Sequence, residues 1–408
     1  MPLTSTDSSI SAPKIGLALS GGGARAMAFH LGCLKALHEL DILPHVKALS
    51  TVSGGSVIGA IYVATDAPFD VFEERVRAAL KRGLLWPTIR TTFVTKEGPK
   101  ALACFIILGL QNMFFLALNW AIWIFAMTLP ARIRRNWRPP NLRPSMRRFA
   151  SRTTILRQAI DNELFKGIRL SDLKDRKPLL IVNAAELRTG SAFYFSPSES
   201  GSWRLGRLAR NDLGLAYAVA ASAAYPVFLP AMQEDLPFDK RDGSRRVERI
   251  MLTDGGVYDN LGLAPFWPDR DPSISLNVDS FDTIICCRAG YGLRHDSPGQ
   301  FLIGRIFSAF TCLLDRSQNA AIKRLYELRE NNKLRAVFIP YLGQDDSRLK
   351  FRPSDLVTRE EAYSYPTDFS PMDSAWIDRL SRRGEQLTKA LIAEHGRDIF
   401  GENCRTGQ

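Results

Sequence analysis

Three short stretches of the chain combine residue types that can perform acyl transfer. The first, "STVSGGS" (50–56), places Ser53 between a run of strand-forming residues and two glycines. A nucleophile elbow, usually G-x-S-x-G, needs small neighbours because it holds its serine on a sharp strand-to-helix turn. Thr51 departs from this pattern, since a β-branched residue there crowds the crossing of strand and helix. Ser53 is therefore a candidate nucleophile, and a polar residue in a flexible loop is the alternative.

The second stretch, "GGGARA" (21–26), follows an expected strand and opens an expected helix. Gly21, Gly22 and Gly23 allow a close approach of the backbone to another group, and a helix start aims free N–H groups at an anion. That anion could be a nucleotide phosphate or the oxyanion of a tetrahedral intermediate. The Lys-Ser/Thr pair of a phosphate loop and the G-x-G-x-x-G spacing are both missing. An oxyanion site and a plain tight turn remain open.

The third stretch supplies a base, which a nucleophilic serine needs. In "MLTDGGVYDNLGLAP" (251–265), Asp254 ends an expected strand and precedes two glycines. A carboxylate can accept the serine proton directly, although an Asx-type turn would also explain the residue. Of five histidines, His295 in "YGLRHDSPGQ" is the one placed after an acid, as in a triad. A Ser53–Asp254 dyad and a Ser53–Asp254–His295 triad both remain possible.

Taken in order, these stretches resemble a known family. "GLALSGGGARA", "TVSGGS" and "DGGVYDNLG" resemble the three signatures of the patatin-like phospholipases. "ASAAYPVFLPA" (221–231) is similar to the small-residue and proline segment upstream of that family's aspartate, and "YPTDF" with "RGEQLTKALI" resembles bacterial members. The resemblance covers residues 14–65 and about 178–395.

The resemblance implies a three-layer α/β/α sandwich with a mainly parallel central sheet. It also implies a serine esterase of the phospholipase A or lysophospholipase type, with no metal and no cofactor. Ser53 would attack the ester carbonyl of a lipid, Asp254 would activate it, the loop 21–23 would form the oxyanion hole, and Arg25 would help to orient that loop. Ala26 departs from the family, which usually has glycine there. A catalytically inactive membrane-binding scaffold with a hydrolase fold is the alternative.

Around these motifs the chain alternates strand, loop and helix, which favours an α/β fold. Strands are expected at 14–20, up to Ser53, and at 178–187, 191–196, 282–287 and 334–340. Helices are expected at 25–40, 55–65, 303–331 and 372–396. We expect one hydrolase domain over 14–400, interrupted by an insertion over 66–177 and preceded by a disordered tail over 1–13.

Composition narrows the class of protein further. The 408 residues can enclose a large core. Six scattered cysteines without a CxxC pair argue against a zinc module or a disulfide scaffold and suit a reducing compartment. The polar start lacks a secretory pattern, so we expect no signal peptide and a location on the cytoplasmic side of a membrane, with peripheral or monotopic attachment.

The insertion has the composition of a membrane-binding segment. Residues 101–130 carry no charge, and residues 131–152 carry eight arginines and no acid, out of a net charge of +12. A transmembrane helix, a hairpin turning at Gln111 and Asn112, and a buried core helix are the alternatives. One crossing would separate Ser53 from Asp254, and two crossings need about 40 residues. We therefore expect a hairpin dipping into one leaflet, with the arginines on anionic headgroups and no nucleic-acid partner.

Overall fold

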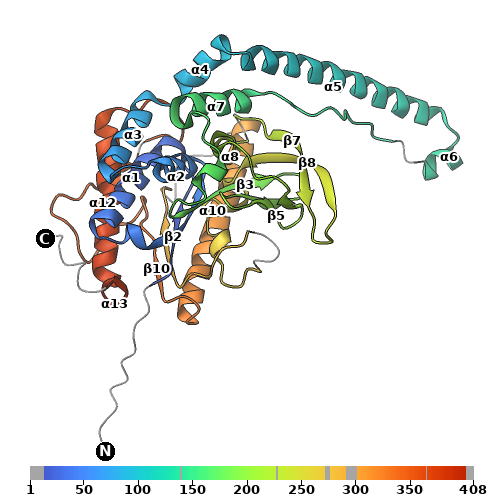
Figure 1. The fold of residues 1–408 in the computed structure, drawn as a ribbon. Helices are drawn as coiled ribbons and strands as arrows, with labels where there is room; N and C mark the ends of the chain where they lie inside the picture. The colour runs from blue at the N-terminus through green and yellow to red at the C-terminus, as the bar shows by residue number, and fades with distance from the viewer. Residues whose placement is uncertain are drawn as a thin grey trace, which may run out of the picture.

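The computed structural model describes residues 13–137, 140–226, 228–271, 276–290, 301–363 and 365–400 (Figure 1). The chain begins with two strand–turn–helix units, β1 (Ile15–Leu19) to α1 (Gly23–Glu39) and β2 (Val46–Val52) to α2 (Gly54–Ala64). These elements confirm the predicted α/β class. The predicted tail, apart from Pro13, lies outside the described residues.

One half of the sheet is parallel. Its strands run in the order β10 (Ala336–Phe338), β9 (Thr283–Cys287), β1, β2 and β3 (Leu179–Glu186), and each neighbouring pair is parallel. The strands β1 and β9 are apolar and buried along their whole length, as expected for parallel strands covered on both faces. All five strands lie within ranges that the sequence predicted.

The other half of the sheet is antiparallel. It contains β4 (Ser191–Phe195), β5 (Ser200–Ser202), β6 (Gly206–Leu208), β7 (Met232–Asp239) and β8 (Arg245–Asp254), and β8 pairs back onto β3 to close a ring. The prediction of a mainly parallel sheet is wrong for this half. Strands β7 and β8 are joined by only five residues, which allow a hairpin but not the crossover that parallel strands require.

Helices cover both faces of the parallel half. Ile15, Leu17 and Leu19 of β1 point into a core shared with α1, α2 and α12 (Ser374–His395). The alternate residue Ala18 points into a second core, which includes Leu325 of α10 (Leu302–Glu330). The structure thus has a helical layer on each side of the sheet (Figure 1).

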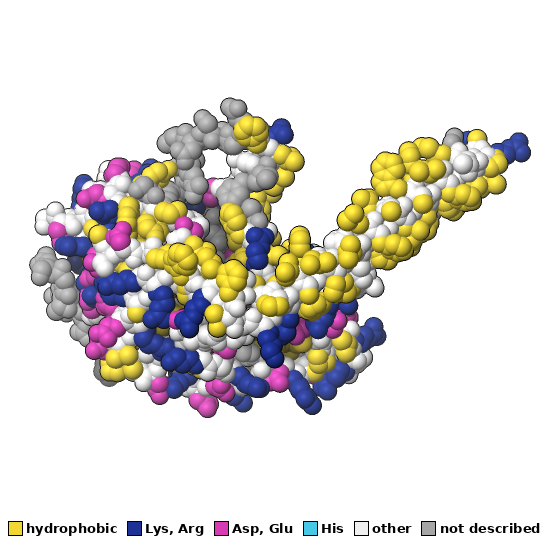
Figure 2. All heavy atoms as spheres, turned by 90° about the horizontal axis from the view of Figure 1, so that it is seen from above, with side chains coloured by type: hydrophobic (Ala, Val, Ile, Leu, Met, Phe, Trp, Pro, Cys, Tyr) yellow, Lys and Arg dark blue, Asp and Glu magenta, His cyan; other side chains and the backbone are white. Residues whose placement is uncertain are grey.

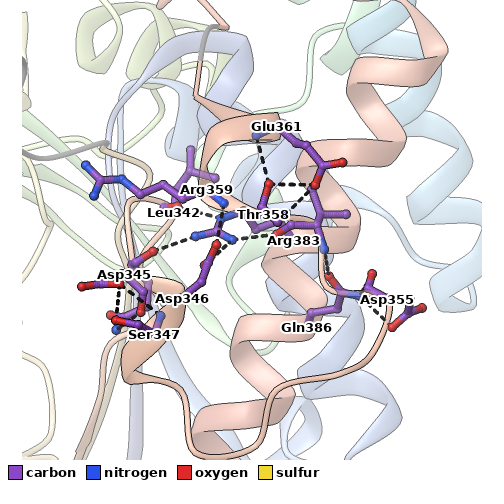
Figure 3. A network of polar contacts seen from close by, with 12 residues as sticks. Leu342, Asp345, Asp346, Ser347, Asp355, Thr358, Arg359, Glu361, Arg383 and Gln386 are labelled. Atoms are coloured by element: carbon purple, nitrogen blue, oxygen red, sulfur yellow. Dashed lines mark hydrogen bonds and ion pairs between the residues drawn. The ribbon is translucent and has the colours of Figure 1, made fainter.

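A buried arginine fixes the segment that precedes α12. Arg383 is fully buried and donates to the carbonyl oxygens of Leu342, Gln344 and Val357, at 2.9, 2.8 and 2.7 Å, and to the Asp346 carboxylate at 2.9 Å (Figure 3). Because each of these groups would be costly to bury alone, the arginine holds residues 342–357 against the helix. The chain continues from there to the candidate site.

The remaining helices belong mostly to the predicted insertion. They are α3 (Phe69–Arg82), α4 (Leu85–Val94), α5 (Glu97–Thr128), α6 (Ala131–Asn136), α7 (Arg152–Ile160), α8 (Leu215–Ser222), α9 (Gly256–Asp259), α11 (Arg359–Ala362) and α13 (Arg397–Phe400), with short 3-10 or π turns between them. Phe72 of α3 and Ile160 of α7 pack into the same core as α1. Both ends of the insertion are therefore anchored in the main body.

The helix α5 projects away from that body (Figure 1). It is long and apolar enough to cross a bilayer by length and composition, and most of its apolar side chains are exposed. Gln111 and Asn112 lie inside this unbroken helix, so the predicted hairpin turning there is wrong. The alternative of a buried core helix is wrong as well.

After α6 the chain runs back along α5 as an extended segment (Figure 1). The Asn119 side chain fixes the two together, donating to Leu142 O at 2.8 Å and accepting from Leu142 N–H at 2.9 Å. Farther along, Arg148 N–H donates to the side chain of Gln233 on β7 at 2.8 Å. We call residues 95–150 the arm: α5, α6 and the returning segment, of which 138–139 lie outside the described residues.

Candidate active site

Ser53 occupies a strained turn between β2 and α2. Its backbone has φ 52° and ψ −120°, a region that residues other than glycine rarely adopt and that recurs at functional sites. A Cβ at Gly54 would overlap Gly23 O, and one at Gly55 would lie 2.5 Å from Leu19 O. Both glycines are therefore required by the close approach of α2 to the first strand–turn–helix unit.

Thr51, the departure from the elbow pattern, has a structural explanation. Its hydroxyl donates to Ile181 O at 3.0 Å, and its methyl group lies where a side chain at Gly59 would project, with Cγ2 2.5 Å from the position of a Cβ there. The small residue that lets α2 cross β2 is thus Gly59 on the helix, whereas the usual elbow pattern has a glycine on the strand, at the position of Thr51.

Asp254 lies beside Ser53 at the end of β8. Its carboxylate accepts a hydrogen bond from Gly256 N–H at 2.7 Å and faces the Ser53 hydroxyl. The side chain is 3 % exposed, and this burial raises its pKa to about 6, although Gly256 and Ser53 act in the opposite direction. A carboxylate tuned in this way can take up a proton near neutral pH.

The antiparallel half of the sheet brings the two residues together. Val52 is paired with Asn183 on β3, and the next residue of β3, Ala184, is paired with Asp254 on β8. Because β8 returns to β3 instead of ending at the far edge, its last residue lies next to the elbow. A Cβ on Gly255 would overlap Asn183 O, so the glycine after the aspartate allows this approach.

The glycine loop lies against Ser53. A Cβ on Gly21 would be 3.3 Å from the Cβ of Ser53, and Gly22 and Gly23 have φ values of +145° and +61°. Gly21 N–H donates a hydrogen bond to Asn260 O at 3.0 Å. Within the described part of the chain, the N–H groups of Gly22 and Gly23 have no acceptor, and they are free to bind an oxyanion at the start of α1.

Arg25 contacts the surroundings of this loop. Its buried guanidinium donates to Ala289 O at 3.1 Å and to Tyr365 O at 3.4 Å. Beside it, Ala24 N–H donates to Asp368 O at 2.7 Å. These bonds connect the first turn of α1 to Ala289 and to the C-terminal segment that leads into α12.

Three further polar residues support the elbow. Ser222 Oγ accepts the Ser53 N–H at 3.0 Å and bonds Ser56 Oγ at 2.8 Å. Asn183 Nδ2 donates to Thr51 O at 2.8 Å, and Asn260 O holds Gly21. The sequence singled out the stretch containing Ser222 by its small residues but assigned it no contact. Nothing in the sequence around Asn183 indicated its role.

The candidate histidine of the triad, His295, lies outside the described residues. His30 is buried in α1, where its Nε2 lies 2.9 Å from Ser20 O. Its ring, Cys33 and Cys287 offer ligand atoms within 4.8 Å of one another, and this group could hold a soft metal ion. Among the contacts of the described residues, it donates nothing to Ser53 or Asp254.

Comparisons with known proteins agree with this fold. The family model for patatin-like phospholipase matches residues 17–267. The structure of human GIVD cytosolic phospholipase A2 in complex with methyl γ-linolenyl fluorophosphonate has a TM-score of 0.51 at 14% identity, over 97% of this chain and 59% of that chain. A second structure of human GIVD cytosolic phospholipase A2 has a TM-score of 0.51 at 14% identity, over 96% of this chain and 60% of that chain.

A third structure, VipD from Legionella pneumophila, has a TM-score of 0.37 at 14% identity, over 94% of this chain and 67% of that chain. Measured against the two human structures, the chain spans about three fifths of their length. At this identity, the likeness to the human enzyme shows a shared fold.

Proposed function

The chain belongs to the patatin-like phospholipase family, and on this basis we propose that it hydrolyses acyl ester bonds of lipids with Ser53 as nucleophile and Asp254 as base. Family membership supports lipid acyl hydrolysis as the activity. The position of the Ser53 hydroxyl beside the buried Asp254 carboxylate, at a strained elbow, is the observation that carries the assignment of residues.

In this mechanism the Ser53 oxygen attacks the ester carbonyl while its proton passes to Asp254. The N–H groups of Gly22 and Gly23 stabilise the resulting oxyanion. As the intermediate collapses, the ester C–O bond breaks and Asp254 returns the proton to the departing alcohol. A water molecule then attacks the acyl-enzyme in the same way, giving the free acid and restoring Ser53.

A dyad fits the contacts better than a triad. In a triad the histidine bonds the serine and the acid bonds the histidine. Here the Ser53 hydroxyl is close enough to Asp254 to lower the pKa of its carboxyl directly, so a histidine inserted between them would have to separate the two residues. We therefore prefer the dyad and keep the Ser53–Asp254–His295 triad as the competing arrangement.

We further propose that the arm lies on the surface of a membrane. An extended segment carrying Arg143, Arg147 and Arg148 is unsuited to crossing hydrocarbon, because its backbone groups would lack partners. The arm is amphipathic as a unit: α5, about 48 Å long, supplies the apolar side and the returning segment supplies the basic side. Anionic headgroups would attract those arginines.

Hydrolysis of a panel of phospholipids and lysophospholipids tests the activity. We expect fatty acid release by the wild-type protein, and losses of at least about a thousandfold in Ser53→Ala and in Asp254→Asn with the fold retained. His295→Ala separates the dyad from the triad, since a dyad should keep its rate within a few-fold. Absence of hydrolysis on the whole panel would favour an inactive scaffold.

A further inference from the structure

The first half of α10 exposes an apolar face. Leu302, Ile306 and Leu313 are 64%, 58% and 61% exposed, and Ala309 is exposed between them. The spacing of i, i+4, i+7 and i+11 places these side chains on one side of the helix. Phe301, just before the helix, is 86% exposed. An amphipathic helix normally turns such a face toward a partner.

Along the same face, the polarity changes halfway down the helix. After Leu313 the exposed positions continue as Arg316, Ala320, Lys323 and Glu327. From Phe301 to Leu314 the helix holds one charged residue, Arg305, and the first acid is Asp315. A protein partner binding along the whole helix would favour one character throughout, whereas a boundary between lipid and water explains a change at one level.

The apolar half of α10 adjoins the candidate active site. The ring of Tyr225 lies 6.0 Å from that of Phe310 and 6.2 Å from that of Phe228, measured between centroids. Tyr225 directly follows Ala224, whose carbonyl accepts the Asp254 N–H at 3.0 Å. Phe228 is itself 60% exposed. An aromatic contact therefore connects the apolar half of α10 to the strand end that carries Asp254.

The polar half of α10 points to the opposite end of the sheet. Leu325 and Leu328 pack with Leu334 and Val337, around the start of β10, so the helix runs from the carboxyl ends of the parallel strands to their amino ends. Its apolar half thus lies at the end of the sheet where the elbow is. Seen from that end, hydrophobic side chains gather over the body as well as along the arm (Figure 2).

We propose that the face formed by Phe228, Phe301, Leu302, Ile306, Ala309 and Leu313, which we call the α10 patch, inserts into the acyl region of the lipid surface that supplies the substrate. This inference rests on the proposed function. It gives the protein two membrane contacts: the arm and a patch beside Ser53 and Asp254. Arg305 and Arg316 can reach headgroups from the edge of the patch, which suits an anionic bilayer.

The exposed thiol of Cys312 provides a probe at the edge of the patch, on the side of Arg305 and Arg316, since Cys33, Cys104, Cys286 and Cys287 are buried. In a Cys404→Ser background, an environment-sensitive NBD label on Cys312 should brighten severalfold and shift to the blue when phosphatidylcholine–phosphatidylglycerol vesicles are added. Two reference labels are placed in proteins that also carry Cys312→Ser. A label on Leu116→Cys, in the arm, should respond to vesicles. A label on Lys323→Cys, below the patch, should stay unchanged.

Each other outcome overturns part of the account. If the arm label responds and the Cys312 label does not, the α10 patch is wrong and the membrane-bound arm stands. If the Cys312 label responds and the arm label does not, only the proposal for the arm is wrong. If neither label responds, both the arm and the α10 patch are overturned as membrane contacts. A Cys312 signal that is already blue without vesicles, or that follows protein concentration, would show cover by this chain or by a second copy and would overturn the patch.

A functional test uses substitutions on the same helix face. Ile306→Asp combined with Leu313→Asp should slow hydrolysis of vesicle lipids about tenfold, because charges oppose insertion. Ala320→Asp, on the same face beyond the change in polarity, should leave the rate within about twofold. Equal losses in both variants would contradict the proposed boundary.

Discussion

Two strongly apolar helices of this protein differ in how much of each is buried. Residues 54–64 form α2, which is almost wholly buried, whereas residues 97–128 form α5, which has three buried residues. The difference lies in side-chain size. Glycine, serine and alanine let α2 approach two strands and a loop closely, while the phenylalanines, tryptophans and leucines of α5 have no such partners among the described residues. Hydropathy alone therefore does not tell which apolar helix belongs to the core.

The largest expected effect contrasts one glycine from each helix. In Gly54→Ala the new methyl group overlaps Gly23 O and displaces the glycine loop, so we expect ester hydrolysis to fall about 10²–10³-fold. In Gly109→Ala the methyl group meets nothing within 4 Å, and the rate should not change. Rates on a soluble ester measure both. A Gly54→Ala protein with wild-type activity would contradict the close approach described for α2.

The second test makes the same type of truncation in both helices. Ile58 is fully buried, so Ile58→Ala should lower the free energy of unfolding by about 2–5 kcal/mol. Leu110 is 63% exposed, and Leu110→Ala should change it by no more than about 0.5 kcal/mol in lipid-free buffer. Urea unfolding gives both values. Equal costs would mean that α5 packs against protein in solution.

The smallest expected effect concerns the crossing of α2 over β2. Gly59→Ala places a methyl group 2.5 Å from Thr51 Cγ2 and should cost about 1–3 kcal/mol of stability. Adding Thr51→Ser removes that Cγ2 and keeps the hydroxyl that donates to Ile181 O, so the double variant should recover most of the loss. Strictly additive effects of the two changes would show that this contact does not limit the crossing.

Much of the parallel half of the fold could be predicted from the sequence. Its strands are short, apolar and followed by glycine turns, and the helices around them have clear periodicity. The strands β5 to β7 could not be predicted in the same way, because β5 and β6 have three residues each and β7 exposes much of its length. Of β8, only the end at Asp254 could be predicted. Their return to β3, which brings Asp254 beside Ser53, is a property of pairing between residues distant in the chain.

The candidate site shows the same division. The residues proposed for chemistry stand out by local pattern, since each requires glycines beside it. Their supports do not: Asn260 and Asp368 hold the glycine loop by backbone carbonyls, which any residue type offers. At Gln111 and Asn112, polar residues within an apolar run suggested a turn, but the helix continues, and it is Asn119 that binds the returning chain.

The reaction of Ser53 with a fluorophosphonate, followed by mass spectrometry across pH, tests the proposed dyad most directly. Burial raises the pKa of Asp254 to about 6, so the carboxylate is ionised and able to accept a proton only above that value. We predict labelling at Ser53 that rises with pH, with a midpoint near 6, and slow labelling without this step in Asp254→Asn. Wild-type labelling in Asp254→Asn, or labelling of a different residue, would contradict the account.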